Sequence, residues 1–284
     1  MSAIFGPAGT DDNFKALGYK NSLDIPEYVT KMGLDCFEYQ CGRGVNIGED
    51  KAKLLGEKAK EAGISLSLHA PYYISMSSVE EEKRLNSVNY ILSSARAINA
   101  MGGNRIIVHT GSCGKITREH ALELAKDTMK LAIKALDEEG LSEIHICPET
   151  MGKVNQLGTL YEVLELCKLD ERLIPCIDFG HLNARDLGIL KTKEDFDNIF
   201  TDIRNALGTD RLKTFHSHFS KIEYTTGGEK KHLTFEDTVF GPEYEPMLDL
   251  VVKYACSPTF ICESAGTQAI DSKQMKDYYE RVLL

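Results

Sequence analysis

The chain has 284 residues, of which 42% are hydrophobic and 27% charged, and its formal net charge is −10. This composition is ordinary for a globular protein and excludes a disordered, collagen-like or coiled-coil chain. The acidic balance disfavours a protein that coats nucleic acid, but it leaves room for a DNA enzyme with a local basic patch. No apolar run approaches the ~20 residues of a membrane helix and no secretory signal is visible, so we expect a cytoplasmic protein without membrane partners.

Short β-rich runs alternate with helical patterns along the whole chain. Strands are predicted at residues 3–6, 35–40, 64–69, 105–110, 143–149, 174–179, 213–219 and 259–263. Helices are predicted at residues 22–32, 49–63, 79–101, 117–139, 155–168, 192–207, 243–255 and 268–283. In the helix at 117–139, apolar residues recur at three- and four-residue steps, Thr117 is the expected N-cap and Gly140 the stop. The longest irregular stretch, 220–241, predicts a functional loop.

Eight strands that alternate with helices predict parallel strands with right-handed crossovers. With this count and length, a closed (β/α)8 TIM barrel is favoured over an open doubly wound sheet. Neither GxGxxG after the first strand nor a P-loop motif is present, so nucleotide-binding folds lose their usual support. No linker or repeat interrupts the pattern, which predicts a single domain over residues 1–284. The eight cysteines form no CxxC pair, and we expect buried free thiols.

Histidines and carboxylates gather at the ends of the predicted strands, where a barrel carries its active site. These residues are His69, His109, Glu149, Asp178, His181, His216, His218 and Glu263. Each alone could be a structural residue, but together they would repel and desolvate one another unless cations lay between them. Imidazole and carboxylate ligands without thiolate suit Zn²⁺, Mn²⁺ or Fe²⁺ in an open catalytic site. The pattern therefore predicts a metal site with more than one ion at this rim.

The segments HAPYYISMSS, IIVHTGS, CPET, CIDFGHLNA, FHSHFSK and FICES, in this order and spacing, resemble the endonuclease IV family of AP endonucleases. These are zinc-dependent barrels within the xylose isomerase-like superfamily, and the resemblance extends from about Phe5 to Glu263. It implies metal-dependent phosphodiester hydrolysis at abasic sites in DNA, a step of DNA base-excision repair. It also implies two or three zinc ions, with Mn²⁺ or Fe²⁺ as alternatives. We expect a monomer.

The resemblance also implies a ligand set. His69 and His109 would bind one ion, and Glu149 would bridge it to a second ion as the central catalytic carboxylate. The second ion would be held also by Asp178, His216 and Glu263. His181 matches a ligand of a third ion.

The sequence departs from the family pattern at this third ion. Lys231 stands where an imidazole is expected, and an ammonium group has no lone pair to offer. His232 would take the role by a shift of one residue, or His218 would, with Glu229 as the carboxylate. We therefore expect a third ion that binds more weakly than the other two.

Substrate contacts are expected around the same rim. Tyr72 matches a family position that contacts DNA near the abasic nucleotide, and Tyr73 lies beside it. Lys221 matches a family lysine, His218 replaces a polar family residue, and Arg43 follows the second strand. DNA requires positive potential at the barrel mouth, and residues 211–232 contain five basic against two acidic side chains.

The alternative is a sugar isomerase or epimerase of the same superfamily. Such an enzyme uses one divalent ion, and Glu149, Asp178, His216 and Glu263 would suffice for it. His69, His109 and His181 are not required as a set by that chemistry, so their presence favours the endonuclease plan. The substrate distinguishes the two.

Overall fold

The structure, a computed structural model, describes residues 2–284. In this part of the chain the strands are β1 (Ile4–Pro7), β2 (Cys36–Gln40), β3 (Ser65–His69), β4 (Arg105–Val108), β5 (His145–Pro148), β6 (Cys176–Asp178), β7 (His216–Phe219), β8 (Lys221–Thr225), β9 (Gly228–Leu233) and β10 (Thr259–Cys262). All but β8 and β9 pair in parallel and correspond to the strands predicted from the sequence.

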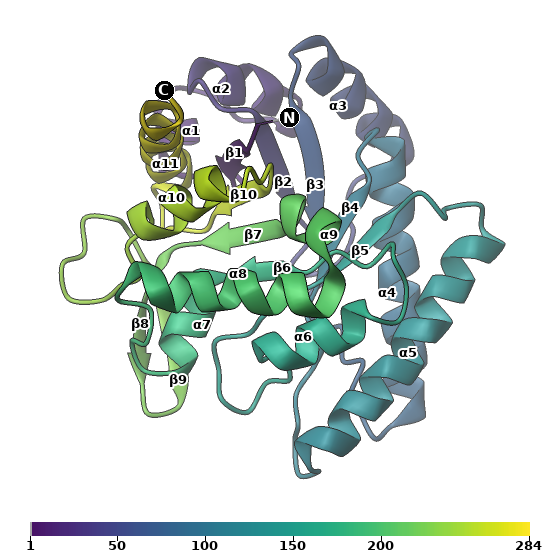
Figure 1. Cartoon of the computed structure of the whole chain (residues 1–284). Helices are drawn as coiled ribbons and strands as arrows, with labels where there is room; N and C mark the ends of the chain where they lie inside the picture. The colour runs from purple at the N-terminus through teal and green to yellow at the C-terminus, as the bar shows by residue number, and fades with distance from the viewer. Residues whose placement is uncertain (1) are drawn as a thin grey trace.

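The parallel strands close into a barrel. They form two arcs, in the orders β1-β10-β7-β6 and β2-β3-β4-β5. Single bridges between Ala8 and Glu38, and between Glu149 and Cys176, join the arcs at both seams. Figure 1 shows the strands at the centre with helices around them. The expected (β/α)8 barrel is confirmed.

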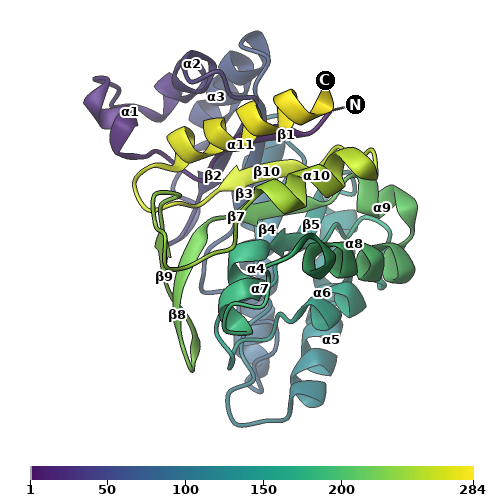
Figure 2. The same ribbon diagram turned by 60° about the vertical axis from the view of Figure 1, so that its left-hand side comes forward.

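Residues 221–233 contain a hairpin where the sequence predicted only a loop. β8 and β9 pair antiparallel, and Figure 2 shows them extending away from the strands of the barrel. The prediction was wrong because Ile222, Tyr224 and Thr225 have strand propensity that the surrounding charges obscured. The turn also depends on Gly228, whose φ is +89° and whose Cβ would lie 2.2 Å from the carbonyl oxygen of Gly152.

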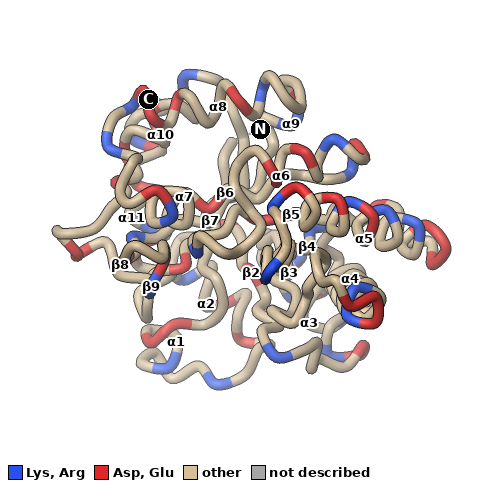
Figure 3. Tube along the Cα trace, turned by 90° about the horizontal axis from the view of Figure 1, so that it is seen from below, with Lys and Arg blue, Asp and Glu red and all other residues tan. Residues whose placement is uncertain are grey.

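The helices surround the barrel. They are α1 (Asp12–Ala16), the 3₁₀ turn η1 (Ser22–Asp24), α2 (Ile25–Lys31), α3 (Glu49–Glu61), α4 (Glu81–Ala100), α5 (Arg118–Glu138), α6 (Leu160–Cys167), α7 (Phe179–Arg185), α8 (Lys193–Leu207), α9 (Thr209–Lys213), α10 (Glu245–Lys253) and α11 (Gln268–Leu283). Thr117 caps α5 as expected, since its hydroxyl accepts from the His120 N–H. Charges of both signs alternate along α5 (Figure 3), as on a solvent-facing helix.

Two boundaries differ from the predicted ones for local reasons. The helix expected from residue 155 begins at Leu160, because Thr159 forms a capping box with Glu162. The strand expected from residue 213 begins at His216, because α9 occupies residues 209–213. The first correction lengthens the loop after β5, and the second places a short helix directly before β7.

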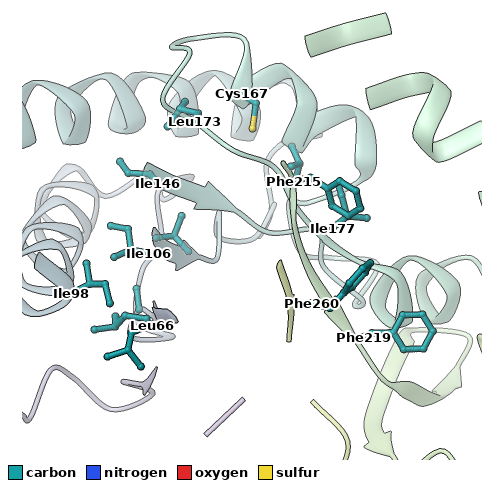
Figure 4. Packing of buried hydrophobic residues seen from close by; sticks show 14 of the residues in the cluster. Leu66, Ile98, Ile106, Ile146, Cys167, Leu173, Ile177, Phe215, Phe219 and Phe260 are labelled. Atoms are coloured by element: carbon teal, nitrogen blue, oxygen red, sulfur yellow. The ribbon is translucent and has the colours of Figure 1, made fainter. Parts of the chain in front are cut away.

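The core lies between the strands and the helices. On one side aromatic rings dominate, and the ring centroids of Phe5 and Phe260 are 5.2 Å apart. Figure 4 shows Phe215, Phe219 and Phe260 on this side and aliphatic side chains on the other. The eight cysteines are buried and free, as expected. Among residues 2–284, no helix has the length and apolar character needed to cross a bilayer.

Gly6 lies where β1 approaches β2 too closely for a side chain. A Cβ at this position would lie 1.9 Å from the carbonyl oxygen of Cys36. We predict that Gly6→Ala lowers the free energy of unfolding by about 3 kcal/mol or more, because backbone atoms cannot move aside as a flexible side chain can. Urea denaturation measures the change. Gly48→Ala is the control, because a Cβ there meets nothing within 4 Å and should cost less than about 1 kcal/mol. Equal losses for the two variants would contradict the prediction.

Candidate metal centre

Four imidazole rings converge on the carboxylate of Glu149, which follows β5 and is buried. Glu149 Oε2 lies 3.3 Å from His69 Nε2 and 3.2 Å from His109 Nε2. Glu149 Oε1 lies 3.1 Å from His218 Nδ1 and 3.3 Å from His181 Nδ1. The histidines come from the ends of β3, β4 and β7 and from the start of α7, so the barrel topology brings them together at its C-terminal rim.

Ligand atoms lie within 4.8 Å of one another in five overlapping groups of side chains. Three of them share Glu149 or Glu263 as bridging carboxylates: His69 with His109 and Glu149; Glu149 with Asp178, His218 and Glu263; and His181 with His232 and Glu263. The other two are His69 with His218 and Glu263, and Cys176 with His216 and His218. Imidazole and carboxylate donors in open groups of this kind suit zinc and similar divalent ions.

Asp178 tests whether a cation fits. Its carboxylate is buried, and its Oδ2 atom lies 3.2 Å from His181 Nδ1 but forms no hydrogen bond with any described residue. A buried carboxylate oxygen without a hydrogen bond is costly, and a cation among Glu149, Asp178, His218 and Glu263 would remove that cost. The donor set therefore fits a divalent ion.

Backbone carbonyls fix the orientation of two of the rings. His69 Nδ1 lies 2.9 Å from the carbonyl oxygen of Ala70, and His181 Nδ1 lies 2.9 Å from that of Thr150. Each Nδ1–H therefore donates to a carbonyl, which leaves the Nε2 lone pair for a ligand. For His69 that nitrogen faces Glu149, and for His181 it faces Glu229 at 3.5 Å.

The pKa values of the histidines and of Glu149 show that the buried carboxylates need positive charge beside them. Burial lowers the pKa of His181, but Asp178 and Glu149 outweigh it and raise the pKa to about 10. Burial acts in the same way on His69, whose contact with Glu149 raises its pKa to about 9. Burial raises the pKa of Glu149, yet His218 and the hydrogen bonds of the other histidines hold it well below its usual range. Imidazolium protons thus balance the carboxylates, a role that bound divalent cations take over when they displace those protons.

The structure places His218, and not His216, beside the group expected to hold the second ion. His216 Nε2 lies 3.0 Å from Glu38 Oε2, deeper in the barrel, and burial lowers the pKa of His216 to about 4. The two residues share a face of β7, but His218 is one pleat nearer the C-terminal rim. Sequence alone could not tell which of them reaches Glu149.

The β8–β9 hairpin carries the third group. Tyr224 pairs with Glu229 and Glu223 pairs with Lys231, so Lys230 is an extra residue on β9. Such a bulge reverses the alternation of side chains beyond it. Lys231 consequently points away from the cavity, with its Nζ 3.3 Å from Glu223 Oε2.

The same bulge directs His232 inward. Its Nε2 lies 3.9 Å from Glu229 Oε1, and its ring centroid lies 5.5 Å from that of His181. His232 therefore lies beside Glu229 and His181, where the one-residue shift predicted from the sequence would place it. His218, the other residue considered for this position, lies with the second group instead.

Two tyrosines form the exposed part of the rim. Tyr72 and Tyr73 are 51% and 49% exposed, and their ring centroids are 4.5 Å apart. Arg43 is also exposed, in the turn after β2. A pocket of about 260 Å³ joins Tyr72 to His69, His109 and Glu149, so the tyrosines lie beside the candidate metal centre.

Lys221 lies apart from this pocket. It is buried, and its Nζ donates to Glu243 Oε1 at 2.7 Å and to the Asp237 carbonyl oxygen at 2.8 Å. Its side chain closes the loop after β9 and does not line the pocket. Lys230 and Lys231 pair with Glu223, so the basic stretch at 211–232 supplies less free charge than the sequence indicated.

Two arginines fix the loop after β5. Arg118, which sequence reasoning missed, and Arg185, which the sequence suggested as a basic residue of the rim, donate to the carbonyl oxygen of Val154 at 3.0 and 2.8 Å. Arg185 is buried in this role. That loop places Lys153 on the pocket wall. Glu38 was missed as well, because its contacts with His216 and His218 depend on strands far apart in the sequence.

The comparisons with known proteins agree with this geometry. The xylose isomerase-like TIM barrel family matches residues 26–280. The chain belongs to this family. It is 34% identical over 281 residues to an uncharacterized protein of Methanocaldococcus jannaschii, covering 98% of this chain and 97% of that protein. It is 30% identical over 220 residues to a probable endonuclease 4 of Oceanobacillus iheyensis, covering 72% of this chain and 71% of that protein.

A solved structure of a D-tagatose 3-epimerase-like protein is similar with a TM-score of 0.72 and 18% identity, over 90% of this chain and 92% of that chain. At that identity the likeness shows the shared barrel alone. Proteins named as an endonuclease and as an epimerase-like protein therefore share this barrel, and only the site can separate their activities.

Glu149 is expected to be indispensable for metal binding. We predict that the wild-type chain binds at least two divalent ions, and that Glu149→Gln weakens binding by about 100-fold or more, because an amide lacks the bridging charge. Elemental analysis and chelator competition measure this, with circular dichroism as a check of the fold. His120→Ala, on the exposed face of α5, should change neither. A folded Glu149→Gln chain that keeps all its ions would contradict the assignment.

His232 is expected to hold the weakest ion. In a metal titration we predict two tight ions and one loose ion. His232→Ala should remove only the loose one, because His232 belongs to the group with His181 and Glu263 and not to the groups that contain His69 or Asp178. Isothermal titration calorimetry resolves the classes. Three ions of equal affinity, or a His232→Ala variant that keeps all three, would show that the hairpin is not part of the metal centre.

Proposed function

We propose that this protein is a metal-dependent phosphodiester hydrolase that cleaves DNA at abasic sites. The observation that carries the proposal is the position of Glu149 between two groups of ligands. His69 and His109 contact one of its oxygens, and His218 contacts the other, in a group with Asp178 and Glu263. A carboxylate shared in this way is typical of two-metal hydrolases. The similarity to a probable endonuclease 4 supports the same activity.

Divalent ions held by these groups would polarise the phosphoryl group and lower the pKa of the attacking water. The chain itself supplies the conditions for this chemistry. Carbonyl contacts hold the rings of His69 and His181 in one orientation, so little reorganisation is needed when substrate binds. The hairpin is fixed by the Glu229 N–H, which donates to the Gly152 carbonyl oxygen at 3.0 Å. It forms one wall of the pocket and limits the access of bulk water.

The rim provides groups suited to a distorted DNA backbone. The paired rings of Tyr72 and Tyr73 can stack beside an extruded nucleotide, because aromatic faces accept any base or sugar edge. Lys153 lines the pocket and is exposed, which suits a contact with a backbone phosphate. Arg43 lies on the same part of the rim as the two tyrosines. These contacts would select for the backbone and the missing base rather than for a sequence.

A duplex with one abasic analogue tests the proposal. We predict that the zinc-loaded chain cleaves on the 5′ side of the analogue and leaves an intact duplex uncut. Tyr72→Ala should lower kcat/KM by about 10-fold or more, because stacking contributes ~1–3 kcal/mol, while the metal content stays unchanged. Gel analysis of a labelled strand provides the measurement, with His120→Ala as the control. Absence of cleavage by a fully metal-loaded chain would contradict the proposal.

A sugar isomerase or epimerase is the second candidate, and the size of the pocket favours it. A volume of about 260 Å³ accommodates a monosaccharide, and Glu149, Asp178, His218 and Glu263 would hold one ion without the other histidines. A panel of aldoses and ketoses, assayed with the same metal-loaded sample, separates the two. Turnover of a sugar without DNA cleavage would establish this candidate in place of the first.

A further inference from the structure

Glu38 is a fully buried carboxylate beneath the candidate metal centre, and it belongs to none of the metal-ligand groups. It lies on β2, on the far side of His218 from Glu149. Glu38 Oε1 lies 2.9 Å from His218 Nε2, a close contact of an ion pair without hydrogen-bond geometry, and accepts from Gln40 Nε2 at 3.3 Å. Glu38 Oε2 forms a hydrogen bond with His216 Nε2 at 3.0 Å. Ser67 Oγ also donates to Oε2, at 2.9 Å. One carboxylate thus contacts both histidines of β7.

His218 lies between two carboxylates that face opposite ring nitrogens. Its Nε2 faces Glu38, while its Nδ1 lies 3.1 Å from Glu149 Oε1 and 3.6 Å from Glu263 Oε1. Buried carboxylates face both ring nitrogens, but the ligand group of Glu149, Asp178 and Glu263 lies on the Nδ1 side. When a cation occupies that side, the ring proton remains on Nε2, beside Glu38. The nitrogen on the other side of the ring then carries the lone pair that can bind a cation.

We propose that Glu38 is a positioning residue that holds His218 in the Nε2-protonated form, so that His218 binds a divalent ion through Nδ1. The proposal rests on the metal centre of the proposed function. It makes His218 different from His69 and His181, whose Nδ1 atoms are held by backbone carbonyls and whose Nε2 atoms face the ligands.

His216 acquires a separate role in this arrangement. Its Nε2–H donates to Glu38, and its ring is fully buried below His218. It therefore occupies the second oxygen of Glu38 and keeps the carboxylate plane directed at His218. In this account His216 supports the ligand and does not itself bind the ion.

Paired glutamine variants separate the two histidines. His218→Gln removes the ligand nitrogen, and we expect at least one ion to be lost. His216→Gln retains an N–H donor for Glu38, and we expect it to keep the full metal content. Chelator competition measures the affinity for zinc, and circular dichroism confirms the fold. Loss of an ion from His216→Gln but not from His218→Gln would overturn the proposal.

Glu38→Gln tests the positioning directly. An amide can donate to the ring as well as accept from it, so both protonated forms of His218 become accessible. We expect the zinc affinity of the site that contains His218 to fall about 10- to 100-fold. Losses of this size follow when a carboxylate that orients a ligating histidine is replaced. Ser67→Ala is the matched control, because it removes one hydrogen bond to Glu38 but keeps the charge, and it should change the affinity by less than about 3-fold. Unchanged affinity in folded Glu38→Gln would overturn the proposal.

A measurement on the wild-type chain needs no variant. In the zinc-loaded protein, ¹⁵N–¹H long-range NMR spectra should show His218 protonated at Nε2 and metal-bound at Nδ1. Zinc bound at Nε2 would overturn the proposal. So would a thiolate charge-transfer band in the cobalt-loaded protein, because it would place an ion at Cys176, which lies beside His216 and His218. A chain that binds the ions as expected but leaves abasic DNA intact contradicts the proposed function and not this inference. A wild-type chain that binds no divalent ion contradicts both.

Discussion

The buried carboxylate of Glu149 is the interaction on which the rest of the site depends. A carboxylate without solvent must be balanced by positive charge, and four imidazoles from separate elements lie within 3.3 Å of it. The barrel makes this possible because the ends of parallel strands meet at one rim. One of the two seams between the arcs passes through the same residue, since Glu149 bridges to Cys176. Glu149 therefore takes part both in the closure of the barrel and in the site.

The supports of the site are arranged by depth. At the rim, the hairpin brings Glu229 and His232 over the pocket, and the bulge on β9 determines which side chains face inward. At the level of Glu149, backbone carbonyls orient His69 and His181. Below it, Glu38 contacts both histidines of β7. The contacts at each depth restrict the orientation of the ligating side chains, so the ligand atoms stay in place without distortion of the strands.

Much of this was accessible from the sequence. The alternation of strands and helices predicted the barrel, and the histidines and carboxylates at strand ends predicted where the site lies. The order of His69, His109, Glu149, Asp178 and Glu263 along the chain was sufficient to predict that they meet. These features are local or follow from topology, so the order of residues along the sequence is sufficient to predict them.

The remainder depends on registers that no local pattern encodes. His216 and His218 have the same parity, and only the height of β7 in the barrel decides which one reaches Glu149. His232 faces the pocket only because of the bulge on β9. Lys221 points away from the pocket because it pairs with Glu243, which lies 22 residues further along the chain. Glu38 was overlooked because a buried carboxylate on β2 acquires meaning only when the barrel brings β7 against it. In each case the missing information is a contact between distant segments.

Anomalous diffraction at the zinc absorption edge, from crystals of the metal-loaded chain, tests the central claim most directly. The account predicts one peak among His69, His109 and Glu149 and a second among Glu149, Asp178, His218 and Glu263, the latter within bonding distance of His218 Nδ1. A single peak, or a peak bound to His216 or Cys176 with none at His218, would contradict it.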